Sequence, residues 1–233
     1  MNARTFVQEL AKGNEAMFRA SELQVKSYFD SKPSKDELVD HFTGRMVNER
    51  MNLIEISAQI AAAPADADVV ELNLLSKQAQ DEARHFRMVK DVIEHISGEP
   101  CDVVAAVEEH STKLDSKGAA LIKKYGADKD PLMLALYQFV AEGRAARNWA
   151  MMSECIEDDF VARTYAKIAK DEKFHSKIGE RKLLQLCSEE EAQERIMEVA
   201  DAMRKDLFLI TCAKSGMNVE SKQIMEDAYG TLH

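Results

Sequence analysis

Hydrophobic residues recur every three or four positions along most of this chain, which is the spacing that places them on one face of an α-helix. Ser34 and Glu37 have the Ser-x-x-Glu spacing of a capping box, and Gly98 is typical of the residue that follows a helix. The pattern therefore predicts long amphipathic helices joined by short connections. The predicted helices cover residues 5–29, 35–62, 66–97, 102–124, 131–155, 159–186 and 189–214, followed by a short helix from Asn218.

The connections between these helices carry start and stop signals. Asp130 and Pro131 are typical of a helix cap and of the first residue after it. Ser188 with Glu191 predicts a second capping box, which opens the helix at 189. The segment 102–124 is more polar than its neighbours, so we expect it to be a crossover helix between two helix pairs.

The composition favours an all-α fold. The chain has 233 residues, 45% of them hydrophobic, and only 9 Gly and 4 Pro, the residues that interrupt helices. A chain of this length can bury a large core. We therefore expect a single domain over 1–233, with a four-helix bundle core at about 35–187 and additional N- and C-terminal helices.

Charge, apolar runs and cysteines exclude several classes of protein. The formal net charge of −10 disfavours non-specific nucleic-acid binding. No hydrophobic run approaches the length of a membrane span, and the N-terminus lacks a signal-peptide core. The cysteines are scattered and form no Cys-x-x-Cys pair, which indicates neither a thiolate metal site nor a disulfide framework. We expect a cytoplasmic protein that binds neither nucleic acid nor membranes.

Two Glu-x-x-His motifs, at 82–85 and 172–175, carry the candidate chemistry. Residues three apart on a helix project from the same face. A lone glutamate on a separate predicted helix precedes each motif by a similar interval, so the order Glu, Glu-x-x-His runs through the chain twice. This is the ligand set of a di-metal site inside a four-helix bundle. The six candidate ligands, which would also be the catalytic residues, are Glu49, Glu82, His85, Glu142, Glu172 and His175.

Each candidate ligand lies in the middle of an apolar stripe of its helix. A single Glu-x-x-His motif is usually an exposed polar pair, but burying even one unpaired carboxylate is costly, and four demand counter-charge. Two divalent cations supply it. One histidine per metal among carboxylates favours iron or manganese over structural zinc. Two iron ions are therefore expected, with manganese or a mixed Mn/Fe pair as the alternative.

At these residues the sequence resembles the ferritin-like di-iron carboxylate oxygenase superfamily, over about 35–187. Residues 81–85 (Asp-Glu-Ala-Arg-His) have its Asp-Glu-x-Arg-His form, whereas Phe174 stands where the second motif would have Arg. The resemblance implies a ferritin-like fold. It also implies that Asp81 and Asp171 each hydrogen-bond the histidine ligand of the opposite motif.

Within the superfamily, residues 142–148 and 168–175 are locally most similar to the catalytic subunit of the phenylacetyl-coenzyme A epoxidase, which has Asp in place of the glutamate at 142. The overall length and the Ala-Tyr-Gly at 228–230 resemble the aldehyde-deformylating oxygenases. The resemblance implies that Glu82 and Glu172 bridge the metals, while the two lone glutamates are terminal ligands. The crossover between the two halves is longer than ferritins usually carry, which favours an oxygenase over a storage protein.

These observations lead to one main hypothesis and two alternatives. The main hypothesis is a di-iron monooxygenase-like enzyme that activates O₂ and oxidises a small organic or acyl substrate. The alternatives are a ferritin- or rubrerythrin-like protein for iron storage or oxidative-stress protection, and a metal-free structural bundle. We expect a homodimer for the oxygenase and a large cage for the storage protein.

An oxygenase of this kind needs electrons from outside the chain. No Gly-x-Gly-x-x-Gly fingerprint of a flavin or nicotinamide site is present, so we expect an external donor such as a reductase or a ferredoxin. One stripe of basic residues is either a solvated face or a docking site for an acidic partner. Its residues are Lys167, Lys170, Lys173, Lys177 and Arg181.

Gly143, directly after a candidate ligand, has two interpretations. Glycine lowers helix stability by about 1 kcal/mol relative to alanine, so its presence in a predicted helix needs a reason. It opens space beside the metals, or it allows a neighbouring helix to approach closely. Gln78 and Gln138 likewise either hydrogen-bond ligands or substrate, or are polar groups at the edge of the core.

Overall fold

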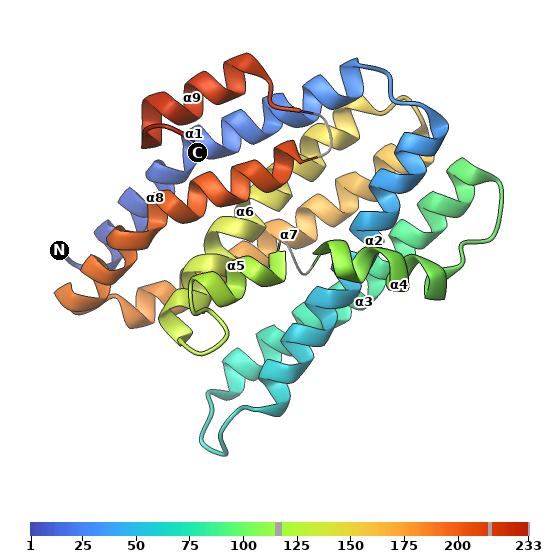
Figure 1. Cartoon of the computed structure of the whole chain (residues 1–233). Coiled ribbons are helices and arrows are strands. Elements are labelled where there is room, and N and C mark those ends of the chain that lie inside the picture. Colours follow the sequence, from blue (N-terminus) through green and yellow to red (C-terminus); the bar gives the residue numbers. More distant parts are fainter. Residues whose placement is uncertain (115–117, 214–215, 233) are drawn as a thin grey trace. The chain divides into compact units, whose positions relative to one another are not determined.

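The computed structural model describes residues 1–114, 118–213 and 216–232, and all regular structure in these ranges is α-helical (Figure 1). This confirms the predicted all-α class. The chain divides into two compact units, Pro33–Ser116 and the combination of Met1–Lys32 with Lys117–His233. A single domain with a ferritin-like bundle stays a prediction. The helices are α1 (Ala3–Asp30), α2 (Lys35–Ala61), α3 (Val69–Ser97), α4 (Val103–Leu114), α5 (Gly118–Lys124), α6 (Pro131–Cys155), α7 (Asp159–Leu186), α8 (Glu190–Cys212) and α9 (Val219–Tyr229).

In the Pro33–Ser116 unit, α2 and α3 form a helical hairpin, and α4 packs against α2. The predicted capping box at the start of α2 is confirmed. The Ser34 hydroxyl accepts the Glu37 N–H, and the Glu37 carboxylate accepts the Ser34 N–H at 2.7 Å. The Ser34 N–H and the Ser34 hydroxyl both donate to the Glu37 carboxylate, which lowers the pKa of Glu37. The cap fixes the point where α2, the helix of the candidate ligand Glu49, begins.

The second helix of this hairpin begins later than predicted. Residues after Pro64 form a turn, closed by a hydrogen bond from the Ala67 N–H to the Pro64 carbonyl at 3.0 Å. Asp68 then caps α3, whose first residue is Val69. The predicted start at 66 was wrong because the proline opens the turn rather than the helix. Gly98 ends α3 in the left-handed conformation (φ 75°), as its position predicted.

In the other unit, α6 and α7 pack together along their length, and α1 lies against both of them and against α8 and α9 (Figure 1). Both helices of the α6–α7 hairpin have the predicted bounds. Asp130 caps α6 by accepting the Leu132 N–H at 2.9 Å, and Pro131 is the first helical residue. Asp158 caps α7 in the same way. The core of this unit includes Met17, Leu136, Val140, Leu183, Ile196, Met203, Leu207 and Phe208.

Glycine brings α6 and α7 close together. A Cβ at Gly179 would lie 2.6 Å from the backbone nitrogen of Phe139 and 2.9 Å from the carbonyl oxygen of Ala135, so no other residue fits without separating the helices. The Ser176 hydroxyl also donates to the Phe139 carbonyl at 3.0 Å. A Cβ at Gly143 would lie 2.8 Å from the ring of Phe18 on α1. Close packing is therefore the interpretation of Gly143 that the structure favours.

Two further sequence predictions need comment. The helix after 186 begins at Glu190, and its cap residue Glu189 makes no side-chain capping hydrogen bond. The predicted box of Ser188 with Glu191 was therefore wrong. The cap lies at Glu189, one residue after Ser188, and the Cys187 N–H still bonds to α7. For the crossover segment the structure gives α4 and α5, and residues 115–117 between them lie outside the described ranges.

The last helix, α9, is anchored to the first by Tyr229. Its hydroxyl accepts the Met17 N–H at 3.1 Å and donates to the Gly13 carbonyl, two groups that stand four residues apart, the spacing of partners in a helical ladder. The buried Arg204 guanidinium lies 5.7 Å from the centre of the Tyr229 ring and donates to Asn14 at 2.8 Å. A side chain at Gly13 would collide with this guanidinium.

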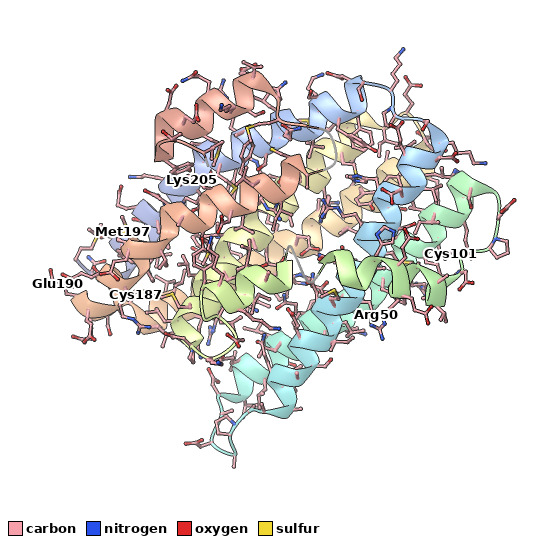
Figure 2. The ribbon with its side chains drawn as sticks, in the orientation of Figure 1. Arg50, Cys101, Cys187, Glu190, Met197 and Lys205 are labelled. Atoms are coloured by element: carbon pink, nitrogen blue, oxygen red, sulfur yellow. The ribbon has the colours of Figure 1, made fainter. Side chains whose placement is uncertain are left out.

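All four cysteines are free. Cys187 lies at the connection between α7 and α8, and Cys101 lies just before α4 (Figure 2). Burial raises the pKa of Cys187 to about 11 and that of Cys212 to about 12, so both are protonated, unreactive thiols at neutral pH. Within the described residues, no helix combines the length and the apolar character that crossing a membrane requires.

Candidate metal centre

The α2–α3 hairpin brings three of the predicted ligands together. Glu49 comes from α2, and Glu82 and His85 come from successive turns of α3. Each offers a ligand atom, and these atoms lie within 4.8 Å of one another. Glu82 and His85 are fully buried, and Glu49 is 3% exposed. We call this group the α2–α3 triad.

The α6–α7 hairpin brings the other three together. Glu142 comes from α6, and Glu172 and His175 come from α7, again with ligand atoms within 4.8 Å of one another. Glu172 and His175 are buried, whereas Glu142 is half-buried. We call this group the α6–α7 triad. Each hairpin thus brings together one lone glutamate and one Glu-x-x-His motif. That all six residues ligate metal in one site stays a prediction.

The same histidine nitrogen faces the carboxylates in both triads. Nδ1 of His85 lies 3.6 Å from Oε2 of Glu49, and Nδ1 of His175 lies 2.9 Å from Oε2 of Glu172. A neutral imidazole can present a lone pair on Nδ1 only when its proton is on Nε2. In that tautomer each triad offers a nitrogen and carboxylate oxygens to the same point, which is the donor set of a divalent cation.

One ligand atom of the α2–α3 triad lacks a hydrogen-bond donor. Oε2 of the buried Glu49 accepts no hydrogen bond from any residue that the structure describes. A buried carboxylate oxygen without a donor or a cation is costly. A metal ion beside His85 would satisfy it. This atom is the most direct structural indication of a cation at the α2–α3 triad.

Asn52 is a residue that sequence reasoning missed. It lies one turn after Glu49 on α2, and its side-chain amide donates to Oε2 of Glu82 at 3.4 Å. It therefore orients the carboxylate that the family resemblance names as a bridging ligand. The spacing of three residues between Glu49 and Asn52 could have indicated it, because residues at that spacing share a helix face.

The aspartates before the two motifs differ in their surroundings. Asp81 is buried and bonded by two cations of its own helix, with Lys77 at 3.1 Å and Arg84 at 2.6 Å. Asp171 is half-buried, directly before Glu172. The implied hydrogen bonds from the two opposite histidines to these aspartates stay predictions. The cations on Asp81 were not foreseen, although their spacing of three and four residues is favourable for a helix.

Other polar residues near the motifs have structural roles. Arg144 is buried and donates to the Leu207 carbonyl and the Thr211 hydroxyl, both at 2.7 Å, which joins α6 to α8. Arg147 pairs with Glu22 of α1. Gln78 is fully buried and Gln138 is nearly so, which does not decide between their two interpretations. None of these side chains is needed to complete the triads.

No known protein family, curated protein or solved structure matches this chain. The functional assignment therefore depends on the two triads. Each contains two carboxylates and one imidazole, and the buried groups of both could hold a metal ion.

Proposed function

We propose that the two triads ligate two iron ions in one shared centre, which activates O₂ and oxidises a small organic or acyl substrate. The observation that carries this proposal is the presence of one carboxylate–histidine triad on each of two helical hairpins, with every member buried except the half-buried Glu142. The sequence order Glu, Glu-x-x-His occurs twice, and this repetition is the ligand rule of dinuclear bundle proteins. It is the reason for joining the triads in one centre.

The residues present fit such a pair of metal ions. Four carboxylates carry four negative charges, which two divalent cations neutralise when both histidines are neutral. A metal ion would also give Oε2 of Glu49, which accepts no hydrogen bond among the described residues, a positively charged partner. Oxygen-rich ligation with one imidazole per metal suits iron or manganese, and iron is the choice that supports O₂ chemistry. Manganese or a mixed pair is the alternative metal content.

Each residue of the two triads would have its own role in holding the metals. Glu82 and Glu172 would bridge the metals, and Glu49 and Glu142 would each bind one of them. Nδ1 of each histidine would complete the set, with the proton kept on Nε2. The Asn52 amide would hold Glu82 in its bridging orientation. Ligands fixed in this way lose little freedom when metal binds.

The bound metals would supply a redox centre and a Lewis acid. The protein keeps bulk water away from the ligands, because apolar side chains of the same helices are buried beside them. On α2 and α3 these are Phe42, Met46, Ile56, Val89 and Val92, and on α6 and α7 they are Phe139, Trp149, Tyr165 and Ile168. Such surroundings strengthen charge interactions and protect reactive species from hydrolysis.

The proposal is tested by anaerobic reconstitution with Fe(II). Purified protein should bind two irons per chain, and Mössbauer spectra after oxidation should show a magnetically coupled pair. His85→Ala and His175→Ala each remove one triad's nitrogen and should lower the iron content. Glu82→Gln should weaken both sites, because Glu82 is a shared ligand in the proposed centre. Glu191→Gln, at an exposed residue of α8, is the matched control.

The outcomes separate the hypotheses. Uncoupled irons, or a Glu82→Gln variant that loses iron from one site only, would show two separate mononuclear sites. Full iron content in both histidine variants would rule out the triads as ligands. Addition of O₂ to the reduced protein then tests the reaction. Decay that depends on an added organic substrate supports an oxygenase, whereas accumulation of ferric mineral supports storage.

A further inference from the structure

The side of α7 that faces solvent is rich in basic residues. Six cationic side chains recur along it at spacings of three and four residues, and all are exposed. Within the described chain, four of them have no carboxylate within ion-pairing distance, whereas Arg163 pairs weakly with Asp159 and Lys177 pairs with Glu180. We call this surface the basic face. It consists of Arg163, Lys167, Lys170, Lys173, Lys177 and Arg181.

This concentration of positive charge has an energetic cost. Like charges three or four residues apart destabilise a helix, and the basic face contains several such pairs, among them Lys167 with Lys170. The chain as a whole carries a net charge of −10. A solvated surface that mixed acidic and basic residues would have less of this repulsion. An acidic partner that docks there would offset the repulsion.

The basic face is also connected to a metal ligand. Phe174 lies between Lys170 and Lys177 on the same strip of the helix and is half-buried. Its ring makes an edge contact with the imidazole of His175, with 6.2 Å between the ring centroids. One helix, about 10–12 Å across with its side chains, therefore separates a partner on this face from the α6–α7 triad.

We propose that the basic face docks an acidic, one-electron carrier protein that reduces the metal centre through α7. This inference rests on the proposed function. Two carrier molecules would each lose one electron, and the two ferric ions would each gain one to become ferrous. Charges at the rim of such an interface mainly accelerate encounter, so their effect depends on ionic strength.

The probe is a plant-type 2Fe–2S ferredoxin, used as an acidic electron carrier. Lys167→Glu with Lys170→Glu reverses two side chains that have no ion pair to lose. Lys123→Glu with Lys129→Glu is the matched control, because both lysines are exposed and lie on α5 or just after it, with no ion pair among the described residues. At low salt, the first double variant should be reduced by ferredoxin at least about tenfold more slowly than the wild type. The control should stay within about twofold, and dithionite should reduce all three equally.

A second variant, Phe174→Leu, separates docking from electron transfer. It keeps every charge of the basic face but removes the ring that contacts His175. It should bind oxidised ferredoxin like the wild type and accept electrons more slowly. Equal reduction of both double variants and the wild type at every salt concentration would overturn the proposal. A change of oligomeric state in the Lys167→Glu/Lys170→Glu variant would overturn it too, since the face would then join copies of this chain.

Binding to the metal-free protein distinguishes failure of this inference from failure of the proposed function. If metal-free protein binds ferredoxin in a salt-dependent way that the reversal abolishes, the docking surface stands even when no iron is taken up. If iron is bound and reduced by dithionite but ferredoxin does not bind, the metal centre stands and the docking surface is wrong.

Discussion

The two hairpins that carry the ligands share a sequence pattern but fix it by different means. In α2–α3 the residue four positions after the histidine is Val89, which is fully buried, whereas in α6–α7 it is Gly179, which lets the helices touch. The hairpin α6–α7 also packs against α1 and α8, whereas α2–α3 is joined in its own unit by α4. The same ligands thus lie on one tightly packed and one more loosely supported frame.

The more loosely supported hairpin, α2–α3, has ion pairs beside its candidate ligands. Arg84 and Lys77 both bond to the buried Asp81 beside the ligand Glu82. In α6–α7 the position of Arg84 is taken by Phe174, which contacts the ligand histidine instead. Close helix packing thus distinguishes the surroundings of the candidate ligands on α6–α7, and buried ion pairs distinguish those on α2–α3. The comparison teaches that one ligand pattern does not require one supporting structure.

The largest effect is expected where packing is closest. Gly179→Val would place its side chain against the backbone of Phe139 and Ala135, which cannot move without parting α6 from α7. We expect a loss of about 3 kcal/mol in the free energy of unfolding, measured by urea denaturation. Val89→Ala, at the corresponding position of α3, should cost about 1–2 kcal/mol by leaving a small cavity. Equal losses in the two variants would remove the distinction between the hairpins.

Metal binding should stabilise the protein and should do so unevenly. A ligand at about 100 times its dissociation constant stabilises the folded state by about 2.7 kcal/mol. Because the α2–α3 triad contains the donor-less Oε2 of Glu49, amide hydrogen exchange should slow more around Glu49 and His85 than around Glu142 and His175. Mn(II) in place of Fe(II) avoids oxidation during the measurement. Uniform protection of both hairpins would contradict the idea that the metal supports α2–α3 more.

A smaller effect is expected from the cations on Asp81. Arg84→Leu removes a charged hydrogen bond to a buried carboxylate, so we expect a loss of about 1.5–3 kcal/mol and weaker metal binding at the α2–α3 triad. Lys77→Leu should cost less, since its side chain is 52% exposed. Phe174→Leu is the counterpart on α7 and should leave stability nearly unchanged. Urea denaturation and metal titration check all three, and equal effects of Arg84→Leu and Lys77→Leu would count against the buried charge as the cause.

The smallest effect concerns the cap of α6. Partial burial raises the pKa of Asp130, but hydrogen bonds from Arg195 and from the Leu132 N–H outweigh it, and the pKa is lowered overall. Because the pKa of Asp130 is lower in the folded state, its charge adds to the free energy of unfolding when the pH is above the unfolded-state pKa of about 3.9. That contribution is lost as the pH falls through the folded-state pKa. Asp130→Asn should therefore cost less than about 1 kcal/mol at neutral pH.

This cost should disappear as pH falls through the lowered folded-state pKa of Asp130, below which the carboxyl group is protonated in both states. Denaturation of Asp130→Asn and wild type across pH 2–7 measures the difference, with the bounds of that range set by the titration of carboxyl groups. Asp68→Asn, at the cap of α3, is the matched variant, since the described residues place no arginine on that cap. A difference that stays constant with pH would mean that the cap, and not the ion pair with Arg195, carries the effect.

Local signals made much of this structure predictable. The bounds of α6 and α7 follow from Asp130, Pro131 and the aspartate at 158, and the members of each triad follow from the Glu-x-x-His spacing. Local spacing was insufficient at Ser188, where the cap residue is Glu189, one position later than the Ser-x-x-Glu pattern predicts. Asn52 was missed because its contact crosses from α2 to α3. Its spacing from Glu49 indicates the shared helix face, but its partner on α3 depends on packing between helices.

The hydroxyl of Tyr229 has a consequence for biosynthesis. Between Gly13 and Met17, α1 is held by a side chain that lies more than two hundred positions later in the chain. While the ribosome is still translating, these two backbone groups have only each other or water as partners. The first helix to emerge is therefore among the last to gain all of its contacts. A premature stop codon shortly before position 229 would remove an anchor from the middle of α1 as well as shorten the far end of the chain.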